Sequence, residues 1–346
     1  MKLQLKEFPT ILLILFRFLI SLECFIIPSS DVTYEDIKAL NATCKGLDSC
    51  ELPRRKNAHE HCNCDSSCSL LGTCCVDSKY RLSYVSPLKN VECALNIYDN
   101  KYHYVPMINS CDQDRVIYDR TIEKFCNSSA EELNDPFLKI PVTDPVTGIS
   151  YKNYYCFACN ENFGREEPIP WNLKIQSGCI HKEFNTTSIP PLRYDSYRKT
   201  WVMNYDGQII MDVSLNTTIP EELKHVTPYC YNFRVITDCA STWADYSVEE
   251  KCAAYMALTR ILSKDGFSVQ YYRNPHCAIC NYENIDDMVC LATEEVYDGE
   301  DTKTDVLSIK LFSLESAICT YSMVYDHFAK QCRNIYTRRK RFHQLG

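Results

Sequence analysis

The first apolar stretch of the chain follows two lysines near its N-terminus. Ile11–Ile20 is almost entirely apolar, Lys2 and Lys6 precede it, and a mixed stretch with small residues follows it. This order is typical of a secretory signal peptide. Arg17 interrupts the run, and a charge near the middle of a membrane-spanning helix costs about 2.5–3.5 kcal/mol. We therefore predict a signal peptide over residues 1–24 and no membrane span in the chain as written, because no other stretch approaches the ~20 apolar residues required.

Two later stretches have the pattern of β-strands. The apolar runs 199–205 and 208–213 flank Asp206-Gly207, a dipeptide that readily adopts the positive φ angles of a tight hairpin turn. Val306–Leu314 alternates apolar and polar residues with a period of two, which predicts a half-buried strand. The patterns therefore predict a central β-hairpin and a strand near the end of the chain.

A third pattern occurs twice. Tyr151–Asn160 and Tyr272–Asn281 share a Tyr, an Asn, a Cys-x2-Cys pair and a final Asn at identical offsets. Before each copy, a segment bounded by two cysteines has the pattern of a helix, namely Cys111–Cys126 and Cys239–Cys252. In the second of these, Ser247-x-x-Glu250 fits a capping box. We expect two copies of one unit, a helix followed by a strand and a Cys-x2-Cys pair, which indicates an internal duplication.

Cysteine content restricts the compartment in which the chain works. The 346 residues include 22 cysteines, a density that would give no framework in a reducing cytosol. Cleavage after Cys24 would leave an odd number of cysteines, so we expect either cleavage after Ser21 or one free or intermolecular thiol. Four Asn-x-Ser/Thr sequons agree with passage through the secretory pathway and mark predicted glycosylation sites: Asn41, Asn127, Asn185 and Asn216.

The two Cys-x2-Cys pairs allow three interpretations. Their four sulfurs could form a zinc site, or each pair could be a redox centre, although no thioredoxin-like βαβ pattern surrounds them. Structural disulfides are favoured in an oxidising compartment. We predict disulfides within the repeat units from the following cysteines: Cys111, Cys126, Cys156, Cys159, Cys179, Cys230, Cys239, Cys252, Cys277, Cys280, Cys290, Cys319 and Cys332.

Charge and motifs restrict the classes of function. The net charge of −8 argues against a nucleic-acid partner, which needs a basic face. The 24 tyrosines suit a protein-binding surface but are also ordinary strand residues. The chain has no His-Glu-x-x-His, phosphate loop or nucleophile elbow, so we predict neither an enzyme nor a cofactor.

A few residues could carry chemistry but have simpler interpretations. His59 and His61 flank the densest cysteine cluster and could hold a metal, yet solvated loop histidines are favoured. Trp201 and Trp243 are expected in the core. Arg338–Arg341 fits a proprotein-convertase consensus, but a basic tail over 336–346 without further role is favoured.

The densest cysteine cluster is Cys62–Cys75, with the spacing Cys-x-Cys-x3-Cys-x5-Cys-Cys. A segment with five cysteines in fourteen residues can hold one shape only through cross-links, each contributing roughly 2–5 kcal/mol. The spacing resembles the somatomedin B domain, a family with eight cysteines. The resemblance implies such a domain over 44–93, with a longer final gap than usual and these cysteines in disulfides: Cys44, Cys50, Cys62, Cys64, Cys68, Cys74, Cys75 and Cys93.

The same resemblance suggests where a partner would bind. The best-known somatomedin B domain binds a protease inhibitor and a receptor through residues between these cysteines. Asp65 matches its acidic position, whereas Leu70 and Leu71 stand where the family has two tyrosines, and Ser67 stands at an apolar position. Asp65, Leu70 and Leu71 are therefore candidate partner-binding residues, but the fold is better supported than the particular partner.

Most of the chain resembles a second group of proteins. The cysteine cluster, Asp135–Val142, the two repeated segments and Val324–Arg333 together are similar to the extracellular region of arthropod Methuselah-like, adhesion-type G-protein-coupled receptors. The resemblance covers about 44–333 and implies a receptor ectodomain, or a shortened or soluble relative of one.

The sequence thus predicts a small disulfide-rich α+β fold. We expect a somatomedin B-like domain over 44–93, repeat unit 1 with its hairpin over 94–225, and repeat unit 2 with a C-terminal loop over 226–335. The predicted function is a non-enzymatic, secreted or extracellular module that binds a protein or peptide ligand. The alternative is a secreted inhibitor or matrix protein whose somatomedin B-like domain binds a protease-related partner.

Overall fold

The computed structural model describes most of the chain after the predicted leader. The described residues are 32–51, 61–81, 88, 90–98, 101–112, 120–160, 167–177, 189–205, 207–231, 233–262, 268–290, 306–309, 319 and 323–335. In these residues helices and strands are mixed and ten disulfides join them, so the predicted disulfide-rich α+β fold is confirmed. Of the helices in this part of the chain, none is both long and apolar enough to cross a membrane. The predicted leader with Cys24, His59, Cys179, Asn185 and the basic tail lie outside the described residues.

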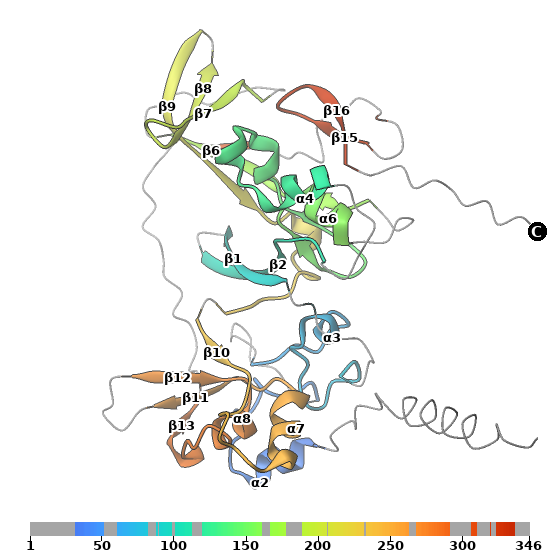
Figure 1. Ribbon diagram of the computed structural model, residues 1–346, viewed down its shortest axis with the longest axis vertical. Coiled ribbons are helices and arrows are strands. Elements are labelled where there is room, and N and C mark those ends of the chain that lie inside the picture. The colour runs from blue at the N-terminus through green and yellow to red at the C-terminus, as the bar shows by residue number, and fades with distance from the viewer. Residues whose placement is uncertain are drawn as a thin grey trace, which may run out of the picture.

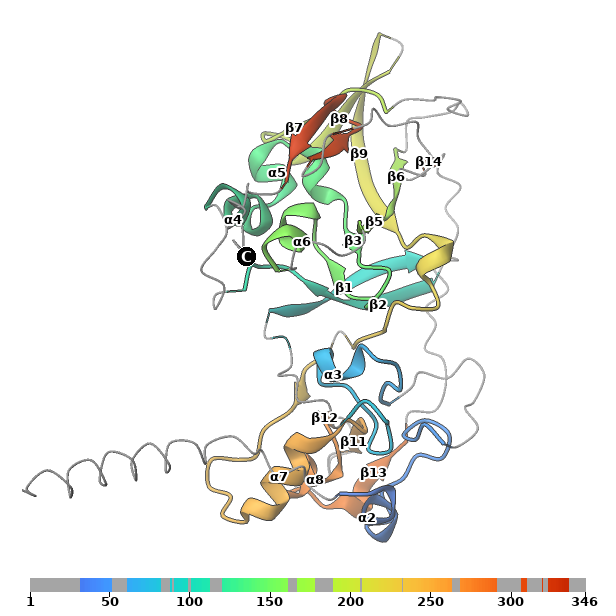
Figure 2. The same ribbon diagram turned by 90° about the vertical axis from the view of Figure 1, so that its right-hand side faces the viewer.

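The described chain is arranged in two lobes (Figures 1 and 2). The upper lobe contains the described parts of 88–231 and 306–335, and the lower lobe those of 32–81 and 233–290. Each lobe therefore combines segments that are distant in the sequence. The predicted unit 226–335 is wrong in this respect, because its terminal segment packs on the first repeat unit and not on the second.

The first sheet of the upper lobe has the order β1-β2-β4-β3-β5. Only β2 and β4 are parallel, and the other neighbours are antiparallel. Its strands are β1 (Val91–Tyr98), β2 (Lys101–Ile108), β3 (Val142–Thr143), β4 (Ser150–Tyr151) and β5 (Ile169–Pro170). The helices beside it are α4 (Arg120–Asn127), α5 (Ala130–Leu133), the 3-10 helix η1 (Pro136–Lys139) and α6 (Tyr154–Asn160).

The second sheet of the upper lobe is antiparallel and has the order β14-β6-β9-β8-β7. Its strands are β6 (Asn172–Gln176), β7 (Leu192–Asp195), β8 (Thr200–Tyr205), β9 (Gln208–Thr218) and β14 (Val306–Ile309). The pairing of Tyr205 with Gln208 confirms the predicted hairpin, and Gly207 has the positive φ of 77° that the turn requires. The predicted strand Val306–Leu314 is confirmed for its first four residues, since the next ones are not described. A turn with η2 (Glu221–Leu223) follows β9, and a terminal hairpin of β15 (Met323–Asp326) and β16 (Gln331–Asn334) lies beside this sheet.

The lower lobe joins an N-terminal module, residues 32–51 and 61–81, to the second repeat unit, residues 233–290. The module contains α2 (Tyr34–Ala39) and α3 (Cys68–Leu71). The second unit has a sheet in the order β10-β12-β11-β13. Its elements are β10 (Val235–Ile236), α7 (Tyr246–Ala254), β11 (Thr259–Leu262), β12 (Val269–Tyr272), α8 (Pro275–Ile279), η3 (Ile285–Asp287) and β13 (Met288–Val289).

The repeated sequence corresponds to a repeated topology. In the first unit β2 pairs in parallel with β4, which pairs antiparallel with β3, which pairs antiparallel with β5. In the second unit β10, β12, β11 and β13 follow one another with the same directions. Tyr151 in β4 and Tyr272 in β12 occupy equivalent positions. Tyr151 pairs in parallel with β2 and antiparallel with β3, and Tyr272 pairs in parallel with β10 and antiparallel with β11.

The residues shared by the two copies have the same structural roles. The side-chain oxygen of Asn153 accepts the backbone N–H of Cys156 at 3.0 Å, and that of Asn274 accepts the N–H of Cys277 at 3.0 Å. Both asparagines thus cap the helix that carries the Cys-x2-Cys pair. Their side-chain amides donate back to the carbonyls near the end of the preceding helix, Phe125 in the first unit and Cys252 in the second. One residue type therefore fixes two helices relative to each other in each unit.

The two units differ in the segment that leads from the first helix to the next strand, from α4 to β3 in the first unit and from α7 to β11 in the second. The first unit has α5 and η1 in this place, with Ser129 and Glu132 forming a capping box at α5. The second unit has only Tyr255–Leu258 between α7 and β11. Helix α7 begins after Asp245, whose carboxylate accepts the N–H of Ser247, so the predicted capping box that starts at Ser247 is wrong.

The largest hydrophobic core belongs to the upper lobe. It lies between α4, α5, η1, α6 and the second sheet, and Phe137, Leu138, Ile140, Leu173 and Met203 are among its fully buried side chains. Trp201 is 4% exposed and lies in this core, as predicted. Three smaller clusters of buried residues lie wholly or largely in the lower lobe, where they join the N-terminal module to the second unit or fill that unit.

Candidate functional site

Three disulfides lie inside the N-terminal module. Cys50 bonds Cys64, Cys62 bonds Cys75, and Cys68 bonds Cys74. The adjacent cysteines Cys74 and Cys75 therefore reach different partners, and the segment is closed around a very short helix, α3.

Two of the eight cysteines assigned to this module bond elsewhere. Cys44 bonds Cys290 of the second unit, 246 residues away, and Cys93 bonds Cys230, 137 residues away. The prediction that Cys44 and Cys93 close the module is corrected accordingly. The physical reason is that the module packs against the second unit, while Cys93 already lies in β1 of the upper lobe. Cys230 lies beside the hairpin of β1 and β2, because its N–H donates to the carbonyl of Tyr104 in β2 at 2.9 Å.

The cysteines of the repeat units pair in the same way in both copies. Cys111–Cys159 and Cys126–Cys156 in the first unit correspond to Cys239–Cys280 and Cys252–Cys277 in the second. Each Cys-x2-Cys pair thus ties its helix to the preceding helix and to the end of the first strand. Cys319–Cys332 closes the terminal hairpin. Each of the 20 cysteines in the described residues is in a disulfide.

This pairing bears on the zinc and redox interpretations. Cys156 and Cys159 lie in the upper lobe and Cys277 and Cys280 in the lower lobe, so the four do not form one site. Three sulfurs in each unit do lie within 4.8 Å of one another, because two disulfides are neighbours. A disulfide sulfur is not a thiolate, the form that binds zinc, and five of the six cysteines in these two groups are buried. The arrangement fits a structural role.

The predicted partner-binding residues of the module lie around α3 but do not share one exposed surface. Asp65 is exposed, and its carboxylate accepts the N–H of Ser67 at 2.9 Å and a hydrogen bond from its hydroxyl. Leu70 and Leu71 are half-buried and pack against the core of the upper lobe. The two leucines therefore hold the lobes together, which leaves Asp65 as the accessible member of the three.

Two of the four predicted glycosylation sites are exposed. Asn41 and Asn127 are exposed asparagines at the ends of short helices. Asn216 is half-buried in β9, and its amide donates to the side-chain oxygen of Gln176 at 2.8 Å. Asn185 is outside the described residues. Of the three sequons in the described residues, Asn41 and Asn127 are thus the ones that the fold leaves most open to a glycan.

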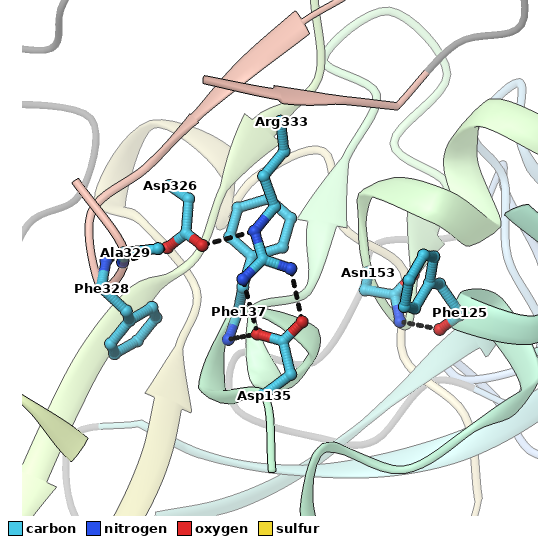
Figure 3. A network of polar contacts seen from close by, with 8 residues as sticks. All are labelled: Phe125, Asp135, Phe137, Asn153, Asp326, Phe328, Ala329 and Arg333. Carbon is cyan, nitrogen blue, oxygen red and sulfur yellow. Dashed lines mark hydrogen bonds and ion pairs between the residues drawn. The ribbon is translucent and has the colours of Figure 1, made fainter. Parts of the chain in front are cut away.

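A polar cluster around Arg333 joins the terminal hairpin to the first unit (Figure 3). The guanidinium contacts both carboxylate oxygens of Asp135, one at 3.0 Å, and Arg333 Nε donates to Asp326 at 2.5 Å. The guanidinium carbon also lies 4.9 Å from the ring centre of Phe137. Arg333 and Asp326 belong to Val324–Arg333, and Asp135 and Phe137 to Asp135–Val142, so two motifs singled out separately in the sequence meet in space.

The charges of this cluster are balanced within it. Burial works against the charge of Arg333, but hydrogen bonds and charges of Asp135 and Asp326 outweigh it and raise the pKa of the guanidinium. Asp326 is completely buried, and its other oxygen accepts the N–H groups of Phe328 and Ala329. Tyr155, whose pKa is raised mainly by burial, also hydrogen-bonds Arg333. Both carboxylates of the cluster accept hydrogen bonds from Arg333 or from backbone N–H groups. The cluster therefore stabilises the contact between the terminal hairpin and the first unit, and its geometry does not indicate a reactive site.

The buried histidines form a feature that the sequence did not reveal. His61, predicted to be a solvated loop residue, is 1% exposed, and burial lowers its pKa to about 4. His276 is 5% exposed, and burial together with the nearby charge of Lys251 also lowers its pKa to about 4. The sequence marked His61 only as a possible metal ligand or a solvated loop residue, and it did not mark His276, because the burial of a side chain depends on tertiary packing.

Exposed aromatic side chains gather at the start of α7. Tyr246 and Tyr282 are 67% and 62% exposed, and the half-buried Trp243 lies beside Tyr282 with ring centres 5.3 Å apart. Thr242 and Tyr282 hydrogen-bond at 3.1 Å, and the indole of Trp243 donates to the carbonyl of Asp245 at 2.9 Å. We call Trp243, Tyr246 and Tyr282 the aromatic surface.

The aromatic surface has the composition of a protein-binding site. Two of its rings, Trp243 and Tyr282, are held by hydrogen bonds and by packing of Trp243 against the core of the second unit, so they lose little freedom on binding. Aromatic residues of this kind are enriched in the centres of protein interfaces. Exposed acidic groups, Asp245 and Glu249, lie beside it in the sequence, and hydrogen bonds from Ser247 lower the pKa of Asp245. Trp243, predicted to be a core residue, lies at the boundary between core and surface.

Comparison with known proteins connects the chain to one family. No curated protein and no solved structure matches it. A family profile, described as a family of unknown function (DUF8401), matches residues 106–332. The matched region begins in β2 and ends in β16, and it therefore includes both repeat units and most of the terminal hairpin, but not the N-terminal module. Since the match spans more than half of its length, the chain belongs to the DUF8401 family.

Proposed function

We propose that the chain is a non-enzymatic extracellular protein-binding module. The observation that carries the proposal is the disulfide pairing of all the described cysteines, which only an oxidising compartment sustains. The exposed sequons Asn41 and Asn127 fit passage through the secretory pathway. The two repeat units supply a rigid scaffold, and the aromatic surface of the second unit is the binding site that we assign to it.

The compartment can be tested directly. Cells that produce the full chain are lysed in an alkylating agent, and the mass of the protein is measured with and without reduction. The proposal expects fewer than three cysteines to be alkylated before reduction, and glycan mass at Asn41 and Asn127. A chain whose cysteines are mostly alkylated without reduction would overturn it.

The binding site can be tested with matched variants. The full chain is displayed as an oligomer and screened against a library of extracellular protein domains. A partner should lose binding to the double variant Tyr246→Ser/Tyr282→Ser and keep binding to Tyr197→Ser, which alters a tyrosine that is 95% exposed in the upper lobe. A partner that binds both variants equally would contradict the assigned surface.

Two finer assignments rest on sequence resemblance. One is that the chain is the ectodomain, or a shortened form, of a Methuselah-like adhesion-type receptor; transcripts that encode seven apolar stretches in frame after Gly346 would support it, and a stop codon there in all transcripts would count against a membrane-bound receptor. The alternative is a secreted inhibitor or matrix protein that uses the somatomedin B-like module. Asp65 is exposed. If Asp65→Ala abolished binding of a protease-related partner, that result would support this alternative.

A further inference from the structure

Backbone hydrogen bonds join the N-terminal module to one short segment of the second unit. This docking segment, Tyr255–Leu258, joins α7 to β11. The N–H of Met256 donates to the carbonyl of Cys74 at 2.7 Å, and the N–H of Leu258 donates to the carbonyl of His61 at 3.0 Å. All four residues of the segment are at most 8% exposed. The contact between the module and the second unit therefore depends on the exclusion of water from this segment.

A buried histidine lies at each end of the docking segment. The backbone of His61 is bonded to Leu258, and neither nitrogen of its ring has a hydrogen-bond partner among the described residues. At the other end, Nδ1 of His276 lies 2.9 Å from the hydroxyl of Tyr255. A neutral imidazole can be buried in this way, whereas an imidazolium would have to be desolvated without a counter-ion.

The charged groups around the two rings do not offset the cost of burying a protonated imidazole. Burial alone accounts for the lowered pKa of His61. At His276 burial and Lys251 act against protonation, and Asp36 of α2 acts weakly in its favour. Tyr255 experiences the charges of Asp36, Asp48 and Arg81, and Asp36 itself pairs with Lys251 at 3.5 Å. Protonation is thus accommodated only when the segment opens to water.

Opening would uncover a specific apolar face. Tyr231, Phe233 and Tyr271 form a stack with ring centres 5.0 and 3.8 Å apart. They pack against the cluster in which Cys62 and Cys75 of the module meet Met256 and Leu258 of the docking segment. Cys44–Cys290 joins the module to the second unit independently of this contact. A released module would therefore stay tethered while the aromatic stack became accessible.

We propose that the contact between the N-terminal module and the second unit is an acid-sensitive joint, in which protonation of His61 and His276 releases the docking segment and exposes the aromatic stack. This proposal does not depend on the proposed function. It gives the protein two states, a closed one at neutral pH and an opened, tethered one in acidic compartments.

The direction and range of the effect follow from proton linkage. Both histidines have folded pKa values of about 4, below the ordinary value of 6.5. The contact therefore has its full stability above pH 6.5 and loses it as the pH falls from 6.5 towards 4, because only the open state takes up protons in that range. At pH 5.5 each histidine increases the opening constant about 10-fold, and the two together about 100-fold.

Hydrogen exchange of the disulfide-intact full chain tests the joint. The amides of Met256 and Leu258 are compared at pH 7.5 and 5.5 after correction for intrinsic exchange, with Leu173 of the upper lobe as an internal reference. We expect their protection to fall about 100-fold relative to Leu173. Equal protection at the two pH values, relative to Leu173, would overturn the proposal.

Variants assign the effect to the two histidines. His61→Met/His276→Gln should reduce the pH response to less than about 3-fold, while His225→Gln, at an exposed histidine of the upper lobe, should keep the full response. A double variant with an undiminished response would refute the assignment. Exchange at the imidazole C2 position of the unmodified protein gives both pKa values without mutation; values below 5 support the joint, and values near 6.5 overturn it.

Discussion

At the residue scale, the two copies of the repeat show which side chains the fold needs. Lys152 and Arg273 stand at the same position in the two copies, one residue before the capping asparagine. Lys152 donates to the carbonyls of Cys126, Asn127 and Ser128 at the end of α4, and Arg273 donates to the carbonyl of Tyr255 at the end of α7. A cation at this position neutralises the free carbonyls of a helix end.

Gly148 is required by a close approach and by its conformation. Its φ is 71°, and a Cβ there would lie 2.2 Å from the carbonyl oxygen of Val226. We expect Gly148→Ala to lower the free energy of unfolding by at least about 2–3 kcal/mol. Denaturant unfolding would measure this.

The matched control for this change is Gly207→Ala. Gly207 also has a positive φ, 77°, but nothing lies within 4 Å of its added Cβ. Its cost should be limited to about 1 kcal/mol of backbone strain. Equal losses at the two glycines would show that the contact with Val226 does not matter.

Arg333 is expected to be sensitive even to replacement by another cation. Arg333→Lys keeps the charge but loses the two-pronged contact with Asp135 and the stacking on Phe137. The side chain of Arg333 is 20% exposed, and the carboxylates of Asp135 and Asp326 are 11% and 0% exposed. We expect a loss of about 2–4 kcal/mol in thermal or denaturant unfolding.

The exposed pair Lys38–Glu35 serves as its reference. Both side chains are more than 60% exposed, and Lys38→Met should change stability by less than about 1 kcal/mol. If Arg333→Lys were equally mild, the cluster in Figure 3 would not hold the terminal hairpin in place.

At the scale of the elements, the repeat unit behaves as one construction used twice. In both copies the side-chain oxygen of the asparagine at the start of the Cys-x2-Cys helix accepts a hydrogen bond from a backbone N–H of that helix. Its side-chain amide donates to a backbone carbonyl near the end of the preceding helix. Asn153 and Asn274 are both completely buried. Their bonds therefore cannot be replaced by water.

Truncation of either asparagine should consequently have a similar effect. We expect Asn153→Ala and Asn274→Ala each to destabilise their own unit by about 2–3 kcal/mol, because a buried cap is lost and backbone carbonyls lose their donors. Hydrogen exchange of Cys156 and Cys277 amides would locate each loss. An effect in only one copy would mean that the two units are not energetically equivalent.

The sequence predicted the elements whose signal is local. The repeat, the hairpin around Asp206-Gly207 and the strand beginning at Val306 could each be identified from spacing and periodicity. The partners of Cys44 and Cys93 could not, because disulfide pairing follows from the packing of distant segments. The same holds for the packing of Leu70 and Leu71 against the core of the upper lobe and for the burial of His61.

At the scale of the whole molecule, each lobe is assembled from two distant parts of the chain. The upper lobe needs β14 and the terminal hairpin, which follow the lower lobe in sequence. A fragment of residues 88–231 would leave β6 without its partner β14 and Asp135 without Arg333. The lobes are therefore structural units but not continuous segments.

This arrangement predicts how fragments behave. Residues 88–231 alone should lack a cooperative thermal transition, and the same residues joined to 306–335 by a flexible linker should regain one. Near-ultraviolet circular dichroism would follow the packing of Trp201 and the tyrosines. A fully cooperative transition for 88–231 alone would show that the upper lobe folds without residues 306–335.

The Cys44–Cys290 bond has a consequence for biosynthesis. Its two cysteines are 246 residues apart, and at 5–20 residues per second the ribosome needs roughly 12–50 s to produce the second after the first. During that interval Cys44 is a reactive thiol next to six cysteines of its own module, any of which can capture it. The protein should therefore mature slowly and depend on a disulfide isomerase of its oxidising compartment to exchange early, non-native bonds for the final ones.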